Sequence, residues 1–70
     1  MSARSEAYEA GYRWATEAGA SMSTDKLVQM RNSAFMRAGE SRMLGRTIEA
    51  ERCDGRADAF EALRRKAVKP

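Results

Sequence analysis

The side chains best suited to chemistry in this chain are one cysteine, Cys53, and ten arginines. The chain has no histidine, so neither Cys53 nor any serine has an imidazole base to activate it as a nucleophile. Without histidine or a second thiol, a structural zinc site has no ligand set. No glycine-rich phosphate-binding loop occurs either. We therefore expect a protein that is not an enzyme and that uses no cofactor and no metal.

Arginine is suited to binding, because its planar guanidinium pairs with a carboxylate or a phosphate through two parallel hydrogen bonds. If residues 42–68 form one helix, arginines gather on one flank and carboxylates on the other. The partner-binding candidates on the basic flank are Arg42, Arg46, Arg52 and Arg56. Three interpretations compete: a solvated helix face with internal ion pairs, a contact with an acidic protein surface, and a contact with nucleic-acid phosphates.

A second candidate surface lies on the first predicted helix, over about residues 5–18. It carries three aromatic side chains, Tyr8, Tyr12 and Trp14. An exposed tryptophan is a frequent anchor of protein interfaces, whereas a buried one belongs to the core. We count all three as partner-binding candidates.

The same helix carries a ridge of small residues spaced by four, which places them on one face. The ridge consists of Ala7, Gly11, Ala15 and Gly19. Such a ridge lets a second helix approach closely, either within the fold or across a homodimer seam.

The elements that must position these residues are all helical. The only proline is the last residue, and no apolar/polar alternation typical of strands occurs. We predict an all-α bundle in a single domain, with helices over about 5–18, 25–38 and 42–68. Gly19 is expected to cap the first helix and Ser23 or Thr24 to begin the second. A break or bend at Gly39 is expected to end the second helix, and the alternative is a helix that runs straight through Gly39. A turn at 53–55 would split the third helix and give four.

The small size of the chain favours a partner. Seventy residues bury only about 60% of the surface that the unfolded chain exposes. An intrachain disulfide is impossible with one cysteine, so good packing or association must supply the missing stability. We expect a homodimer or a complex with another molecule.

Two weaker signals point towards nucleic acid. Residues 25–51 could form a helix-turn-helix with Gly39 near the turn. The segment from Ala7 to Tyr12 resembles the opening of the ribosome modulation factor family, whose members associate with ribosomal RNA. The chain lacks that family's later Cys-Pro-Tyr and Gly-Gly-Trp elements, so we carry no residue role across.

The sequence thus predicts a small helical regulator or inhibitor, of phage or mobile-element type, that docks on a larger host protein. The alternative is a nucleic-acid- or ribosome-associated factor that uses the arginine-rich helix face. The net charge of +3 is compatible with both. No apolar segment is long enough to span a membrane and no signal-peptide pattern opens the chain, so a cytoplasmic protein without a membrane partner is expected.

Overall fold

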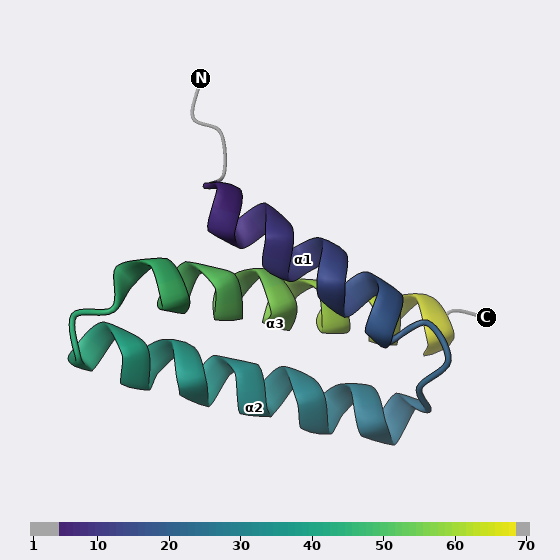
Figure 1. The fold of residues 1–70 in the computed structure, drawn as a ribbon. Helices are drawn as coiled ribbons and strands as arrows, with labels where there is room; N and C mark the ends of the chain where they lie inside the picture. Colours follow the sequence, from purple (N-terminus) through teal and green to yellow (C-terminus); the bar gives the residue numbers. More distant parts are fainter. Residues whose placement is uncertain (1–4, 69–70) are drawn as a thin grey trace.

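The computed structural model describes residues 5–68, which form three helices and no strand (Figure 1). The helices are α1 (Glu6–Ala18), α2 (Thr24–Met43) and α3 (Thr47–Val68). Helix α3 is the central element, because α1 and α2 each pack along it. The predicted all-helical architecture is confirmed at the level of three packed helices.

Local capping sets the ends of α1 and the start of α2. The Ser5 Oγ accepts a hydrogen bond from the Tyr8 backbone N–H at 3.1 Å, and the Ser23 Oγ accepts one from Lys26 N–H at 3.2 Å. Gly19 is the C-cap of α1, and its N–H donates to the Ala15 carbonyl at 2.8 Å. These caps satisfy backbone groups that a helix terminus leaves free. The predicted caps at Gly19 and Ser23 are therefore confirmed.

Helix α2 does not end at Gly39, so the predicted helix over 25–38 is too short. Good helix formers follow the glycine, and Ala38 and Ser41 on either side of it are buried against the rest of the fold. Packing of this face outweighs the roughly 0.5–1 kcal/mol that a glycine costs in a helix interior. The helix-turn-helix predicted over residues 25–51 had its turn near Gly39, where the structure has continuous helix.

The actual turn lies at Gly45, which has a φ of 76°. Arg46 N–H donates to the Ser41 carbonyl at 2.7 Å and Gly45 N–H to the Arg42 carbonyl at 3.1 Å. This hydrogen-bond pair is a Schellman motif, in which glycine adopts the left-handed conformation without a steric cost. The third helix accordingly begins at Thr47 and not at residue 42. It continues without a break through 53–55, so the alternative with four helices is wrong.

Helices α1 and α3 cross with their backbones almost in contact. A Cβ atom added at Gly11 would lie 2.1 Å from the Arg52 carbonyl oxygen, and one added at Gly55 would lie 2.1 Å from the Tyr8 carbonyl oxygen. Neither position could hold a side chain without moving a helix. Gly55 therefore lets α1 approach α3 closely.

The core is small and consists largely of alanine. Phe60 is the largest fully buried side chain, and it clusters with Ala15, Leu27 and Ala59. Several large apolar side chains instead reach solvent, with exposed fractions between 48% and 88%: Trp14, Phe35, Met36, Met43, Leu44, Ile48 and Val68. A chain of this size leaves much of its apolar surface uncovered.

Candidate functional site

The two tyrosines of the predicted aromatic surface serve the fold. The Tyr8 hydroxyl donates a hydrogen bond to the Asp58 carboxylate of α3. Tyr12 packs against the buried cluster, and the two tyrosine rings lie 6.2 Å apart. Both side chains are half-buried between α1 and α3. They attach α1 to α3 and contribute little free surface.

Trp14 differs from the tyrosines because it is 48% exposed. One edge of its ring packs on Phe60 at a centroid distance of 6.5 Å and an interplanar angle of 88°. The Arg56 guanidinium carbon lies 4.4 Å from the ring centroid. A cation over an indole face is attracted by the ring quadrupole, and this attraction fixes both groups in place.

The four arginines of the predicted flank do not lie on one helix, although Arg46 and Arg52 line one surface hollow with Ile48 and Glu49. Arg42 belongs to the end of α2 and pairs with Asp54, whereas Arg46 lies in the turn, 4.0 Å from the Glu49 carboxylate. Only Arg52 and Arg56 of the four candidates lie on α3. Neither has an ion pair among the described residues. The cause of the error is the helix boundary, since the third helix starts five residues later than predicted.

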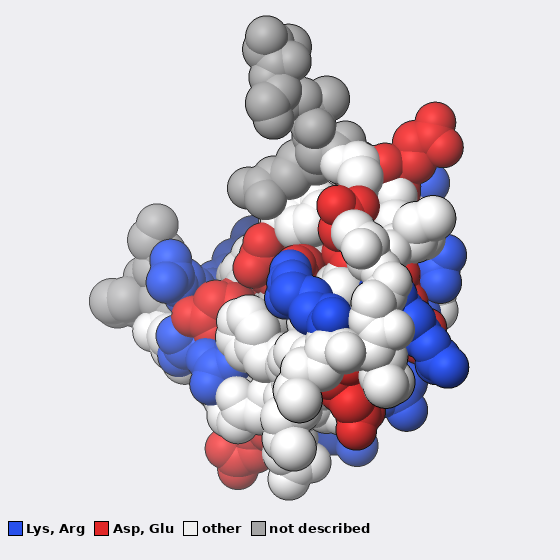
Figure 2. Space-filling view, turned by 90° about the vertical axis from the view of Figure 1, so that its left-hand side faces the viewer, with Lys and Arg blue, Asp and Glu red and all other residues white. Residues whose placement is uncertain are grey.

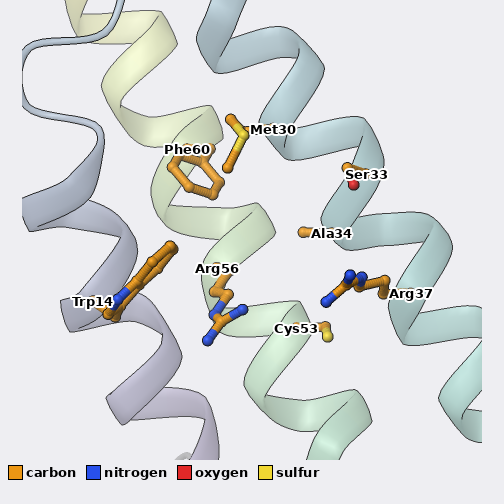
Figure 3. Close-up of a pocket in the computed structure, with 8 residues that line it drawn as sticks. All are labelled: Trp14, Met30, Ser33, Ala34, Arg37, Cys53, Arg56 and Phe60. Carbon is orange, nitrogen blue, oxygen red and sulfur yellow. The ribbon is translucent and has the colours of Figure 1, made fainter.

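A groove brings Arg56 and Trp14 together with residues of α2. Figure 3 shows the side chains of Arg37 and Arg56 approaching it from opposite sides, with Cys53 and Phe60 along α3. The groove has a volume of about 190 Å³. Its lining residues are Trp14, Met30, Ser33, Ala34, Arg37, Cys53, Arg56 and Phe60. We call it the Trp14–Arg37–Arg56 groove.

The two guanidiniums of this groove lack carboxylate partners within residues 5–68. The Arg56 Nε is buried and has no hydrogen-bond acceptor. A buried donor without an acceptor costs free energy, and a guanidinium without an ion pair can receive an incoming carboxylate. The groove therefore combines an aromatic wall and an apolar floor with two cations that are free to pair.

Sequence reasoning missed Arg37. The only sequence signal for Arg37 is its spacing within the second helix. Met30, Ser33 and Arg37 follow one another at spacings of three and four, so they share one flank. All three residues lie inside the predicted helix over 25–38, but their spacing does not show that this flank meets Arg56 of α3.

Three other arginines contrast with this pair because they surround one carboxylate. Glu61 accepts hydrogen bonds from Arg31 at 2.6 Å, from Arg64 at 2.7 Å and from Arg65 at 2.9 Å. The bonds from Arg64 and Arg31 hold the pKa of Glu61 far below its ordinary value of 4.5. This cluster ties α2 to α3, so its arginines are structural.

The small-residue ridge is also used inside the molecule. Gly11, Ala15 and Gly19 are buried and Ala7 is half-buried. Gly11 faces the Arg52 backbone, and Gly19 lies against Leu63 and Leu27. Of the two interpretations of the ridge, packing within the fold is the one that the structure shows, so a homodimer seam would need another surface.

The end of the molecule where α2 turns into α3 carries charges of both signs around uncharged atoms (Figure 2). Met43, Leu44 and Ile48 of this region are 88%, 63% and 66% exposed. This view shows no broad single-sign field of the kind that marks a nucleic-acid surface.

Comparison with family models, with curated proteins and with solved structures found no match to this chain. Within residues 5–68, no helix is long and apolar enough to cross a membrane. The same residues contain no cluster of three acidic or cysteine side chains that could hold a metal ion. The Trp14–Arg37–Arg56 groove is the candidate functional site of the described residues.

Proposed function

We propose that this chain is a non-enzymatic regulator or inhibitor that docks on a larger protein, and that its Trp14–Arg37–Arg56 groove receives an acidic segment of that protein. The observation that supports this proposal is the pair of guanidiniums beside an exposed indole, neither with a carboxylate among the described residues. Aromatic and arginine side chains are enriched at the energetic centres of protein interfaces.

The chemistry of the groove specifies what would bind. Two carboxylates would pair with Arg37 and Arg56, and an apolar side chain between them would cover Phe60 and Met30. A phosphate backbone would satisfy the cations, but it would leave the apolar floor without a partner. An acidic protein segment with an apolar residue at its centre therefore fits the groove better than nucleic acid.

Trp14 provides a direct test, because it is the only tryptophan in the chain and lines the groove. We would titrate the chain with a short peptide that carries glutamates on both sides of a leucine, and follow tryptophan fluorescence. The matched probe replaces the glutamates by glutamines. We expect saturable binding of the acidic peptide and a loss of at least about tenfold in affinity for the glutamine peptide, since charged hydrogen bonds contribute about 1.5–3 kcal/mol.

Two charge-reversal variants make this prediction specific. Arg37→Glu places a carboxylate in the groove, whereas Arg13→Glu makes the same charge change on an exposed part of α1. We expect Arg37→Glu to weaken acidic-peptide binding by about tenfold or more and Arg13→Glu to leave it nearly unchanged. Equal losses in both variants would show that net charge alone is responsible, which contradicts a specific groove.

Oligonucleotides serve as the competing probe. Single-stranded RNA and duplex DNA of mixed sequence are titrated in the same assay at two salt concentrations. A fluorescence response to nucleic acid with a steep salt dependence, and none to the acidic peptide, would overturn the proposal in favour of phosphate binding.

A further inference from the structure

A second surface of the molecule lies on the side of α2 that faces away from α3. At 100° per residue, a sector of about 100° on this side contains Val28, Phe35, Met36, Gly39 and Met43. We call these residues the α2 outer stripe. Asn32 is the other residue inside the sector, so no charged side chain interrupts it between Asp25 and Met43. In a chain that is 33% charged, an uncharged face of this length is unusual.

The stripe is uncovered in the folded chain except at Val28, which is half-buried. Phe35 is 50% exposed, Met36 76% and Met43 88%. Figure 1 shows α2 along one edge of the molecule with α3 on its other side. The structure thus places Phe35 towards solvent. Helix α2 therefore presents apolar residues on two sides, of which α3 covers one.

Gly39 indicates that the element covering the exposed side of α2 is a helix. The chain has three glycines in helix interiors, and two of them, Gly11 and Gly55, allow another helix backbone to approach closely. The third, Gly39, has no atom within 4 Å of an added Cβ. The fold thus gives no packing reason for a glycine there, although it weakens the helix. A second helix seated on the stripe would give the glycine the role that Gly11 and Gly55 have.

The charges at the ends of α2 select a second copy of this chain as that helix. Asp25 lies at the N-terminal end of the stripe and has no ion pair among the described residues, whereas Arg46 lies just beyond the C-terminal end and approaches the Glu49 carboxylate only at 4.0 Å. If two copies pair antiparallel about a two-fold axis near Phe35 and Met36, Val28 faces Met43 of the other copy and Asn32 faces Gly39. Asp25 then lies opposite Arg46 of the other copy. A parallel arrangement would instead place like charges together.

We infer that two copies of this chain form an antiparallel homodimer through the α2 outer stripe. This surface replaces the small-residue ridge of α1, which the fold itself occupies. The Trp14–Arg37–Arg56 groove lies on another flank of α2, so the dimer would carry two free grooves. The inference does not depend on what the groove binds.

Sedimentation equilibrium across micromolar to submillimolar concentrations tests association. We expect a monomer–dimer equilibrium, and we expect Met36→Glu to raise the dissociation constant at least about tenfold, because it places a carboxylate in the apolar seam. Thr16→Glu adds the same charge on the exposed side of α1 and should have no effect. Circular dichroism checks that both variants remain helical, and Met36→Glu should keep the fluorescence response of Trp14. A wild-type chain that stays monomeric throughout would overturn the inference.

Disulfide trapping tests the antiparallel geometry without disturbing the fold. In a Cys53→Ala background, Met36→Cys lies near the two-fold axis and should form a covalent dimer on mild oxidation. Met43→Cys should not, because the two copies of residue 43 would be separated by about 22 Å along the helix axis. Cross-linking of both variants would show a parallel pair, and cross-linking of neither would show that the stripe is not the seam.

Discussion

A Cβ atom at Gly55 would lie 2.1 Å from the Tyr8 carbonyl oxygen and 2.9 Å from the Tyr12 nitrogen. These neighbours are backbone atoms of α1, which cannot move aside by changing a rotamer. A methyl group at residue 55 must therefore push α1 away from α3 and weaken the contacts that Tyr8 and Trp14 make with α3. We expect Gly55→Ala to lower the free energy of unfolding by about 1–3 kcal/mol, measured by urea denaturation.

Gly39→Ala is the matched control for this prediction. Measured in dilute solution, where association does not contribute, it should raise stability by roughly 0.5–1 kcal/mol, because its site is open and alanine favours the helix. If Gly55→Ala were as stable as the wild type, the close crossing of α1 and α3 would be wrong.

At the scale of elements, α2 is tied to α3 by a carboxylate with three arginine partners. The Glu61 pKa is lowered mainly by hydrogen bonds from Arg64 and Arg31, and Arg31 is the only one of the three that belongs to α2. A carboxyl group whose folded-state pKa is depressed stabilises the fold above its unfolded-state pKa. This stabilisation is lost as pH falls through and below about 4.5.

We therefore expect Glu61→Gln to lower stability at neutral pH and to flatten the fall in stability between pH 5 and the acid limit of folding. Thermal unfolding followed by circular dichroism across this range gives the measurement. Glu17→Gln, which removes an exposed carboxylate without a described ion pair, should leave the pH profile unchanged. A wild-type-like profile for Glu61→Gln would mean that the three arginines do not stabilise the folded state through this carboxylate.

The helices themselves could be predicted where local signals decide. Ser5, Ser23 and Gly19 act through hydrogen bonds to residues within four positions, so their roles are readable from the sequence. The choice between Gly39 and Gly45 as the end of α2 is different, because it depends on whether Ala38 and Ser41 find a helix to pack against. That information lies in α3 and is not local.

The misplaced boundary between the second and third helices also explains why only part of the candidate site was predicted. Trp14 and Arg56 were both predicted as binding residues. In the structure the Arg56 guanidinium carbon lies 4.4 Å from the centroid of the Trp14 ring. Arg42 and Arg46 were placed beside Arg56 only because the third helix was begun too early. Arg37 was missed, since its proximity to Arg56 depends on how α2 is placed beside α3. Pairings between helices of this kind cannot be read from the spacing within one helix.

For the molecule as a whole, the two outer helices depend on the central one. The middle of α3, from Ala50 to Phe60, contains six buried residues and contacts α1 on one side and α2 on the other. Helix α1 contributes only two buried residues, Gly11 and Ala15, and α2 has its outer stripe free in the monomer. Opening α1 locally therefore exposes less apolar surface than opening α3, which requires both neighbours to separate.

Amide hydrogen exchange should reflect this hierarchy. In dilute solution we expect the slowest exchange in the middle of α3, with α2 next and α1 fastest, measured by mass spectrometry of peptic fragments. At high protein concentration the inferred dimer should slow exchange in α2 selectively, because only α2 gains a covering helix. Met36→Glu should abolish that concentration dependence while it preserves the order found in dilute solution. Uniform protection of the three helices would contradict the central role of α3, since it would mean that they open only together.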